Sequence, residues 1–236
     1  MRKEPFEVGD YLHVYNCGNR KMTIFQKESD YWRFLKSLRY FNNQDPQENV
    51  FRELDFLIKS GGGKNFEWPK SWQAQKPLVK ILAYCLMPNH FHLLLKEIIK
   101  GGVTGFMRKL GTGFTNYVNI KYGETGRVFQ GSYKSKTLTD VRYLQYLDAY
   151  IQALNPFELY PGGIEKSLKE FDKAFEFALN YPFSSLDESF EKRKIFVIER
   201  DVLEELFTNL KIYKEFTYDA LIVRNAREIL GKLAID

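Results

Sequence analysis

The sequence predicts an α+β protein built on a ferredoxin-like β-α-β-β-α-β antiparallel sheet. Two apolar runs, 77–86 and 90–96, are separated only by a turn at Met87-Pro88-Asn89 and read as a hairpin. An alternating segment near the N-terminus supplies another strand. One segment of helical spacing lies between this first strand and the hairpin, and a second lies between the hairpin and a basic segment near residue 130. That order of elements is the ferredoxin-like pattern.

The first strand is expected at 11–15, followed by turn residues at 16–19. Residues 22–26 either extend this strand or form a short second piece. A helix begins at Ser29-Asp30 and runs to about Phe41, because its apolar residues recur every three or four positions.

Residues 42–76 have no sustained periodicity and are predicted to be an insertion between the first helix and the second strand. Within it, 51–58 could form a short helix and 60–64 a flexible glycine loop. This loop lacks the final Gly-Lys-Ser/Thr of a P-loop, so it does not indicate a nucleotide-triphosphate site.

The hairpin strands are continuous apolar runs rather than alternating ones, which predicts two central strands buried on both faces. A helix is expected over 98–122 with Gly123 as its C-cap. Residues 127–134 form a strand or an extended basic segment. Thr139-Asp140 begins a further helix that carries three tyrosines and ends at Asn155-Pro156.

Residues 1–156 are predicted to form the functional domain and 157–236 a mostly helical C-terminal appendage. Helices are expected there at 166–179, 201–209 and 218–233, with a turn at 181–185 and a short apolar run at 195–198.

The composition narrows the classes of function. The net charge of +5 suits a polyanionic partner, and 16% of the 236 residues are aromatic. The two cysteines do not form a C-x-x-C pair, which argues against a zinc knuckle. No uncharged run approaches the ~18 residues of a membrane span. The N-terminus shows no signal-peptide pattern, so a cytoplasmic protein without a membrane partner is expected.

The candidate chemistry begins with His90 and His92. On a strand, residues two apart point to the same face, so both imidazoles can grip one metal ion. The predicted helix 139–155 offers Tyr143, Tyr146 and Tyr150, any of which could attack a phosphodiester beside a divalent ion.

A surface for nucleic acid is also predicted, because cations track phosphates and aromatic rings stack on unpaired bases. The candidate DNA-binding residues are Arg127, Phe129, Gln130, Tyr133, Lys134, Lys136, Arg108 and Lys109.

Four segments, 13–19, 87–94, 126–135 and 150–156, resemble in the same order those of the single-tyrosine HUH transposases. They look most like the REP-associated tyrosine transposase branch, which is IS200-like. The resemblance covers roughly residues 8 to 185. Met-Pro-Asn-His-x-His followed by apolar residues is fairly specific to this family, and all four segments in order are highly specific.

The resemblance implies a single-stranded DNA nuclease that cuts near imperfect hairpins and acts as a homodimer. It implies Mg²⁺ or Mn²⁺ held by His90 and His92, and Tyr150 as the nucleophile that forms a 5′-phosphotyrosine and releases a 3′-OH. The 3′-OH can later reverse the reaction on a new end, which is strand transfer. His13 is expected to be structural.

One departure concerns the third metal ligand, which in the family follows the tyrosine by four residues. Leu154 occupies that position here, and Asn155 comes five residues after Tyr150. Either the helix contains a one-residue π-bulge that brings Asn155 into place, or the ligand set differs, or catalysis is impaired. The rival functions are therefore a DNA-hairpin-binding protein without chemistry and a metal-dependent phosphoesterase that uses no covalent tyrosine.

Overall fold

The computed structural model describes residues 5–45, 49–59 and 66–233. At its centre is a four-stranded antiparallel sheet with the strand order β2-β3-β1-β4. Helices lie in the sequence between the first and second strands and between the third and fourth strands, which confirms the predicted β-α-β-β-α-β order. The strands are β1 (Tyr11–Cys17), β2 (Val79–Met87), β3 (His90–Glu97) and β4 (Lys134–Leu138).

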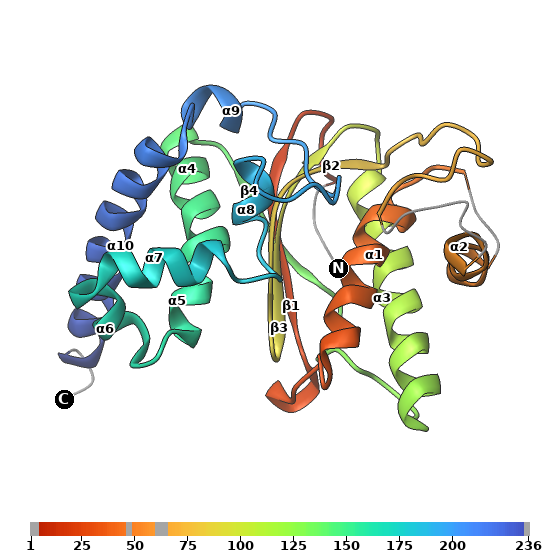
Figure 1. Cartoon of the computed structure of the whole chain (residues 1–236), viewed down its shortest axis with the longest axis horizontal. Coiled ribbons are helices and arrows are strands. Elements are labelled where there is room, and N and C mark those ends of the chain that lie inside the picture. The colour runs from red at the N-terminus through yellow and green to blue at the C-terminus, as the bar shows by residue number, and fades with distance from the viewer. Residues whose placement is uncertain (1–4, 46–48, 60–65, 234–236) are drawn as a thin grey trace.

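Helices cover both faces of the sheet (Figure 1). On one face lie α1 (Glu28–Phe41) and α3 (Gly102–Tyr122), with α2 (Val50–Lys59) outside them. The opposite face is covered by α4 (Val141–Ala149), the π-helical segment η2 (Tyr150–Leu154), α5 (Asn155–Leu159), α6 (Gly163–Lys169), α7 (Phe171–Leu179) and α10 (Leu210–Leu233). The short elements are η1 (Asn19–Lys21), α8 (Leu186–Ser189) and α9 (Leu203–Leu206).

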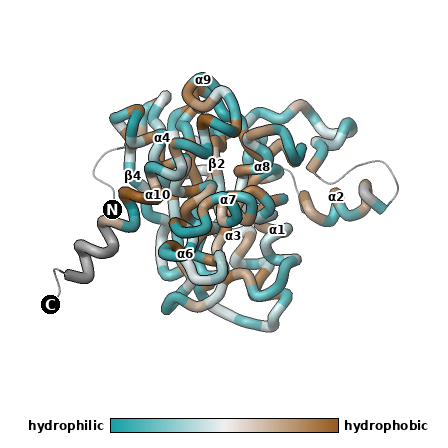
Figure 2. Tube along the Cα trace, turned by 60° about the vertical axis from the view of Figure 1, so that its left-hand side comes forward, coloured by the Kyte–Doolittle hydropathy of each residue, from teal (hydrophilic) through white to brown (hydrophobic). Residues whose placement is uncertain are grey.

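Strand alternation divides the interior into two cores. Leu12 and Val14 of β1 join Phe91 and Leu93 of β3 in the core beneath α1 and α3. The neighbouring residues, such as Leu94, face the core beneath α4 and α10. Figure 2 shows hydrophilic and hydrophobic residues alternating along outer helices such as α2, as expected where one helix face is buried. No helix among the described residues combines the length and apolar character needed to cross a bilayer.

Three sequence-based expectations about the first part of the chain need correction. Asn16 and Cys17 belong to β1, because they pair with Phe91 and His90, and the turn begins at Gly18. Residues 22–26 form no strand. The strand expected near 127–134 is β4 at Lys134–Leu138, and the basic segment before it is irregular. Helices α1, α2 and α3 are confirmed, while the loop at 60–64 lies outside the described residues.

The prediction of two central hairpin strands is wrong for β2, which is an edge strand of the sheet. Its apolar sequence is nevertheless buried, because the chain after α7 covers its outer edge. The amide of Leu86 donates to the carbonyl of Phe183, and the amide of Glu199 donates to that of Ile81. Because these hydrogen bonds cover the edge, β2 needs none of the charged residues or prolines that keep an exposed edge strand from pairing with another chain.

The C-terminal helices also differ in their limits. The single helix expected at 166–179 is divided into α6 and α7 at Glu170, whose φ of −122° and ψ of 45° are not helical. The segment 201–209 contains only the short α9, and α10 begins at Leu210, earlier than expected. The short α8 was not predicted.

Candidate active site

Three histidines lie together on the face of the sheet opposite to α1 and α3. The antiparallel register places His92 opposite Tyr15 and His90 opposite Cys17, so His13, two residues before Tyr15, shares their face. Nε2 of His13 lies 2.8 Å from Nδ1 of His92, and the two rings stack with their centroids 5.1 Å apart. The rings of His90 and His92 are 5.0 Å apart.

The sequence alone indicates a structural role for His13, but the structure joins it directly to His92. The only signal available beforehand was its position on a strand. Which strand pairs with which is a tertiary property, so the sequence of β1 alone does not reveal that His13 lies beside His92.

Burial keeps these histidines neutral. It lowers the pKa of His13 to about 4, helped by the nearby positive charge of Lys136. Desolvation also lowers the pKa of His90 and places the pKa of His92 well below its usual range. A neutral imidazole has the lone pair that a metal ion requires.

The remaining ring nitrogens have defined partners. Nδ1 of His90 lies 2.7 Å from Oδ1 of Asn89, an oxygen that can only accept, so this nitrogen carries the proton and Nε2 keeps its lone pair. The contact between His92 and His13 likewise uses Nδ1 of His92. Hydrogen bonds of this kind fix the tautomer and orientation of a ligating histidine.

Tyr150 lies directly against this cluster. Its ring centroid is 5.5 Å from that of His92 and 6.4 Å from that of His13, with both pairs edge-on. The guanidinium carbon of Arg224, on α10, lies 5.2 Å from the centroid of the same ring. Burial raises the pKa of the Tyr150 phenol while Arg224 lowers it, so the phenol is protonated at neutral pH.

The two other tyrosines of α4 are placed differently. Tyr146 stacks on Tyr150 with the ring centroids 6.4 Å apart and precedes it by about one helical turn. Tyr143 contacts Lys136, whose ammonium nitrogen lies 4.6 Å from the ring centroid. Tyr150 is in ring contact with both His13 and His92.

The helix that carries Tyr150 contains a π-helical turn immediately after it. Residues Tyr150–Leu154 are π-helical, and the amide of Asn155 donates to the carbonyl of Tyr150, five residues back. The chain therefore contains the one-residue bulge that was one of the alternatives for this segment. Asn155 lies one π turn beyond Tyr150 and on the same side of the helix.

The helix also continues through Asn155-Pro156 instead of ending there, which corrects the sequence-based boundary. Pro156 has no amide hydrogen to donate to the carbonyl of Gln152. The hydroxyl of Ser184 donates to that carbonyl instead, at 2.7 Å. The carbonyl of Leu154 accepts from Arg224 at 3.0 Å. The two backbone carbonyls that the irregular turn leaves without a helical partner are therefore satisfied, one by the segment after α7 and the other by helix α10.

Asn155 is fully buried, yet neither its Oδ1 nor its Nδ2 has a hydrogen-bond partner among the described residues. An orphaned buried amide of this kind is costly unless a ligand completes it. Two neutral imidazoles and an amide oxygen form a donor set that suits a divalent ion such as Mn²⁺. The chemical types of these donors therefore fit a metal ion, although the described residues contain no group of three or more His, Cys, Asp or Glu side chains able to hold one.

A buried polar network fastens the tyrosine-bearing helix to the C-terminal part of the chain. Asp148 is fully buried, and both of its carboxylate oxygens accept from Nη1 of Arg200, at 3.1 and 3.2 Å. Nε2 of Gln152 donates to the same carboxylate at 2.7 Å. The Oε1 atom of Gln152 accepts from the hydroxyls of Ser185 and Ser189. Asp148 and Gln152, which flank the stretch 149–151 that contains Tyr150, are thereby held in place.

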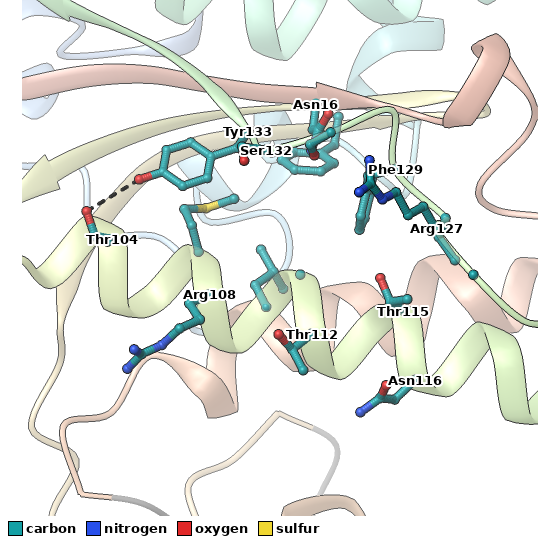
Figure 3. Close-up of a pocket in the computed structure, with 17 residues that line it drawn as sticks. Asn16, Thr104, Arg108, Thr112, Thr115, Asn116, Arg127, Phe129, Ser132 and Tyr133 are labelled. Carbon is teal, nitrogen blue, oxygen red and sulfur yellow. Dashed lines mark hydrogen bonds between the residues drawn. The ribbon is translucent and has the colours of Figure 1, made fainter. Parts of the chain in front are cut away.

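The predicted DNA-binding residues divide between the two faces of the sheet. Lys134 and Lys136 on β4 pair with Tyr15 and His13, so they lie on the histidine face. Gln130 accepts from the thiol of Cys17, which pairs with His90 and shares the histidine face. The side chains of the others lie elsewhere: Arg108, Arg127, Phe129 and Tyr133 line a groove beside α3 (Figure 3), and Lys109 donates to the carbonyl of Asn43. The single basic surface expected from the sequence is therefore two surfaces.

Residues 70–154 match the family model described as "Transposase IS200 like". This match confirms the resemblance found in the sequence segments, and it includes β2, β3, α3, β4 and the helix as far as Leu154. It is consistent with a DNA-processing enzyme. None of the curated proteins matches the chain.

Solved structures with a similar arrangement include a REP-associated tyrosine transposase bound to a REP hairpin. It is 12% identical, with a TM-score of 0.44, and the alignment covers 83% of this chain and 88% of that one. A putative transposase from Deinococcus radiodurans R1 is 16% identical, with a TM-score of 0.31 and coverage of 62% and 95%.

Proposed function

We propose that this protein is a metal-dependent transposase that cleaves and rejoins single-stranded DNA through Tyr150. The observation that carries the proposal is the contact of the Tyr150 ring with His13 and His92, on a helix whose π turn aligns Asn155 with the tyrosine. The family match over residues 70–154 supports the same activity.

In the proposed reaction, Oη of Tyr150 attacks the scissile phosphorus and forms a phosphotyrosine bond to the 5′ end. The bond from phosphorus to the 3′ oxygen breaks, and that oxygen takes up a proton while the phenol loses one. Because the phosphotyrosine conserves the energy of the phosphodiester, the 3′-OH of another end can attack it in turn, and strand transfer needs no external energy source.

His90, His92 and Asn155 would hold Mg²⁺ or Mn²⁺. A bound divalent ion neutralises charge on the phosphate and orients it for attack. His13 holds the ring of His92 in place through its hydrogen bond. Arg224 contacts the Tyr150 ring and the carbonyl of Leu154, so it fixes the ring and favours the charge that develops on the phenol oxygen.

The proposed substrate is single-stranded DNA that contains imperfect hairpins. Lys134 and Lys136 lie on the same face as the histidines and are suited to contact the phosphates on either side of the cleavage point. We also propose a homodimer and a cytoplasmic location, which light scattering and cell fractionation would test.

The decisive experiment is covalent capture of a hairpin-flanked oligonucleotide in the presence of Mn²⁺. Tyr150→Phe should abolish capture and leave DNA binding intact, whereas Tyr146→Phe, the matched control one turn away, should retain capture. Undiminished capture by Tyr150→Phe would rule out the assignment of the nucleophile.

The principal alternative is a hairpin-binding protein that has lost its chemistry. The π turn argues against it, because it removes the mismatch of spacing that first suggested it. Failure of the wild-type protein to cleave any single strand with Mn²⁺ would favour this alternative. Turnover that survives Tyr→Phe changes at positions 143, 146 and 150 together would instead indicate a phosphoesterase without a covalent tyrosine.

A further inference from the structure

Tyr15 lies beside the histidine cluster, on the same face of the sheet. The antiparallel register places Tyr15 of β1 between His92 of β3 and Lys134 of β4. The centroid of its ring is 4.9 Å from that of His13 and 5.7 Å from that of His92, with the ring planes tilted by 30° and 31°. Tyr15 therefore contacts the same two imidazoles as Tyr150, but it projects from the sheet and not from a helix.

The part of the face that carries Tyr15 is open to solvent. The π-helical segment η2 packs against β2 and β3, whereas Lys134 and Lys136 of the outer strand β4 are exposed and Tyr15 is half-exposed. Among the described residues, Tyr15 belongs to neither hydrophobic core, and its hydroxyl forms no hydrogen bond. Packing of the protein interior therefore does not account for an aromatic ring at this position.

The surroundings of Tyr15 supply positive charge. Lys134 lies directly opposite Tyr15, where the Cβ atoms of paired side chains are about 4.5–5.5 Å apart, and Lys136 follows two residues later on the same face. Lys136 donates to the hydroxyl of Tyr143, and neither lysine forms an ion pair with another described residue. An aromatic ring on an open four-stranded sheet, with free cations beside it, is suited to stack on an unpaired base and to hold its phosphates.

We propose that Tyr15 stacks on the unpaired base next to the scissile phosphate and that Lys134 contacts the phosphate on the other side of that nucleotide. The proposal rests on the proposed function, because His92 and Tyr150 define where the scissile phosphate lies. A base held on Tyr15 fixes the position of its sugar, so the phosphorus stays in line with Oη of Tyr150. Tyr15 is thus a substrate-positioning residue, and it requires a single strand at the cleavage point, because the faces of the bases are covered in a duplex.

Two substitutions separate the ring of Tyr15 from its hydroxyl. Tyr15→Phe keeps the ring, whereas Tyr15→Val removes it and retains a residue of high β propensity. Tyr218→Leu is the matched control, because it removes another exposed tyrosine ring, which lies on α10 and packs against Phe171. All variants are made in a Tyr150→Phe parent, so that binding is measured without cleavage, and their melting temperatures are compared with that of the parent.

The measurement is fluorescence anisotropy in the presence of Mn²⁺, with a labelled oligonucleotide that carries a hairpin and a single-stranded flank. In a series of such oligonucleotides, each unpaired nucleotide in turn is replaced by an abasic one. We expect Tyr15→Val to weaken binding of the complete oligonucleotide roughly tenfold, as for the loss of one stacked base. Tyr15→Phe should retain most of the affinity because it keeps the ring, and Tyr218→Leu should bind like the parent. At one position, next to the bond that the wild type cleaves, the abasic nucleotide should weaken binding by the parent roughly tenfold but leave binding by Tyr15→Val unchanged, which is the coupling expected of a direct contact.

A second measurement needs no change at Tyr15. With 5-iodouracil at the coupled position, irradiation of the parent complex should cross-link the base to Tyr15, which mass spectrometry of the digested protein identifies. Lys134→Met should reduce the salt dependence of binding by about 0.7 in the logarithmic slope, the value for one phosphate of a single strand. Additive losses at every abasic position, equal losses for Tyr15→Phe and Tyr15→Val, or a cross-link confined to other residues would each overturn the proposal. So would a loss of Mn²⁺ affinity in DNA-free titrations of Tyr15→Val that matches its loss of DNA affinity, because Tyr15 would then act by orienting His92.

The outcomes separate the role of Tyr15 from the proposed chemistry. If the wild type captures DNA through Tyr150 but the abasic series shows no coupling with Tyr15, the stacking assignment fails and the proposed nucleophile is retained. If the coupling is found but the wild type captures no DNA, the proposed chemistry fails and the assignment of Tyr15 to a base-binding position is retained.

Discussion

Removing the positive charge of Arg200 tests the network that holds the tyrosine-bearing helix. In Arg200→Met the side chain keeps much of its length, but the carboxylate of Asp148, which is fully buried, loses its counter-ion. Breaking a buried ion pair by removing one partner costs about 3–5 kcal/mol. The remaining donation from Gln152, at 2.7 Å, offsets part of this cost, so we expect a loss of about 3 kcal/mol.

Urea unfolding followed by circular dichroism measures this loss at pH 7, with an unchanged m-value as evidence that the unfolded state is the same. Arg142→Met is the matched control, because the Arg142 side chain is 91% exposed. We expect that variant to remain within about 0.5 kcal/mol of the wild type.

The pH dependence follows from Asp148. Burial raises the pKa of its carboxyl above the usual value, although Arg200 lowers it. Between the unfolded and folded pKa values the native state holds more protons than the unfolded chain, so this group makes stability fall as pH rises. Without Arg200 the pKa rises further, and Arg200→Met should recover stability when the pH is lowered from 7 toward 5.

A double variant completes the test. Asp148→Asn removes the buried charge, so in the Arg200→Met background it should restore much of the lost stability, as in a double-mutant cycle for a coupled pair. A loss below about 1 kcal/mol for Arg200→Met, or a further loss on adding Asp148→Asn, would refute the reasoning that the ion pair compensates a buried charge.

Other expected outcomes concern the helices and the histidines. Gly111→Ala should raise the free energy of unfolding by about 0.5–1 kcal/mol, because it replaces a glycine inside α3 at a position where an added Cβ meets no other atom. Gly113→Ala should lower the free energy of unfolding, because its Cβ would clash with the ring of Phe41; thermal melts of both variants check this. Asp30→Asn should cost about 1.5–3 kcal/mol at pH 7 through lost charged hydrogen bonds. Because the pKa of the Asp30 carboxyl is lowered by its hydrogen-bond partners, that difference should shrink as the pH falls toward 3, and a constant difference in urea titrations would contradict the assignment. His13→Phe should weaken Mn²⁺ binding roughly 10–100-fold in calorimetric titrations, and unaltered affinity would show that His13 does not orient His92.

Local patterns predicted most of the elements. Strand β1 and helices α1 and α3 follow from periodicity, and β3 follows from a continuous apolar run. Gly123 caps α3 with a φ of 65°, as a C-cap glycine should. The edge position of β2 was missed because its apolar sequence reflects a covering segment nearly one hundred residues later. Burial can be inferred from composition, but the identity of the covering segment cannot.

The candidate site was predictable only in part, because local sequence does not show which distant segments come into contact. His90, His92 and Tyr150 lie in recognisable segments, and the structure brings the rings of His92 and Tyr150 together. His13 and Arg224 come from opposite ends of the chain, and only the folded structure brings them to the tyrosine.

The π turn also limits how the chain can be divided. The carbonyls of Gln152 and Leu154 receive their hydrogen bonds from Ser184 and Arg224, both beyond residue 156. A protein shortened at that point, or a chimera that takes its C-terminal region from another source, would leave these two acceptors buried and unsatisfied next to the tyrosine. The π turn after Tyr150 and the C-terminal segments that donate to it therefore depend on each other, so a chimeric protein must take both from the same source.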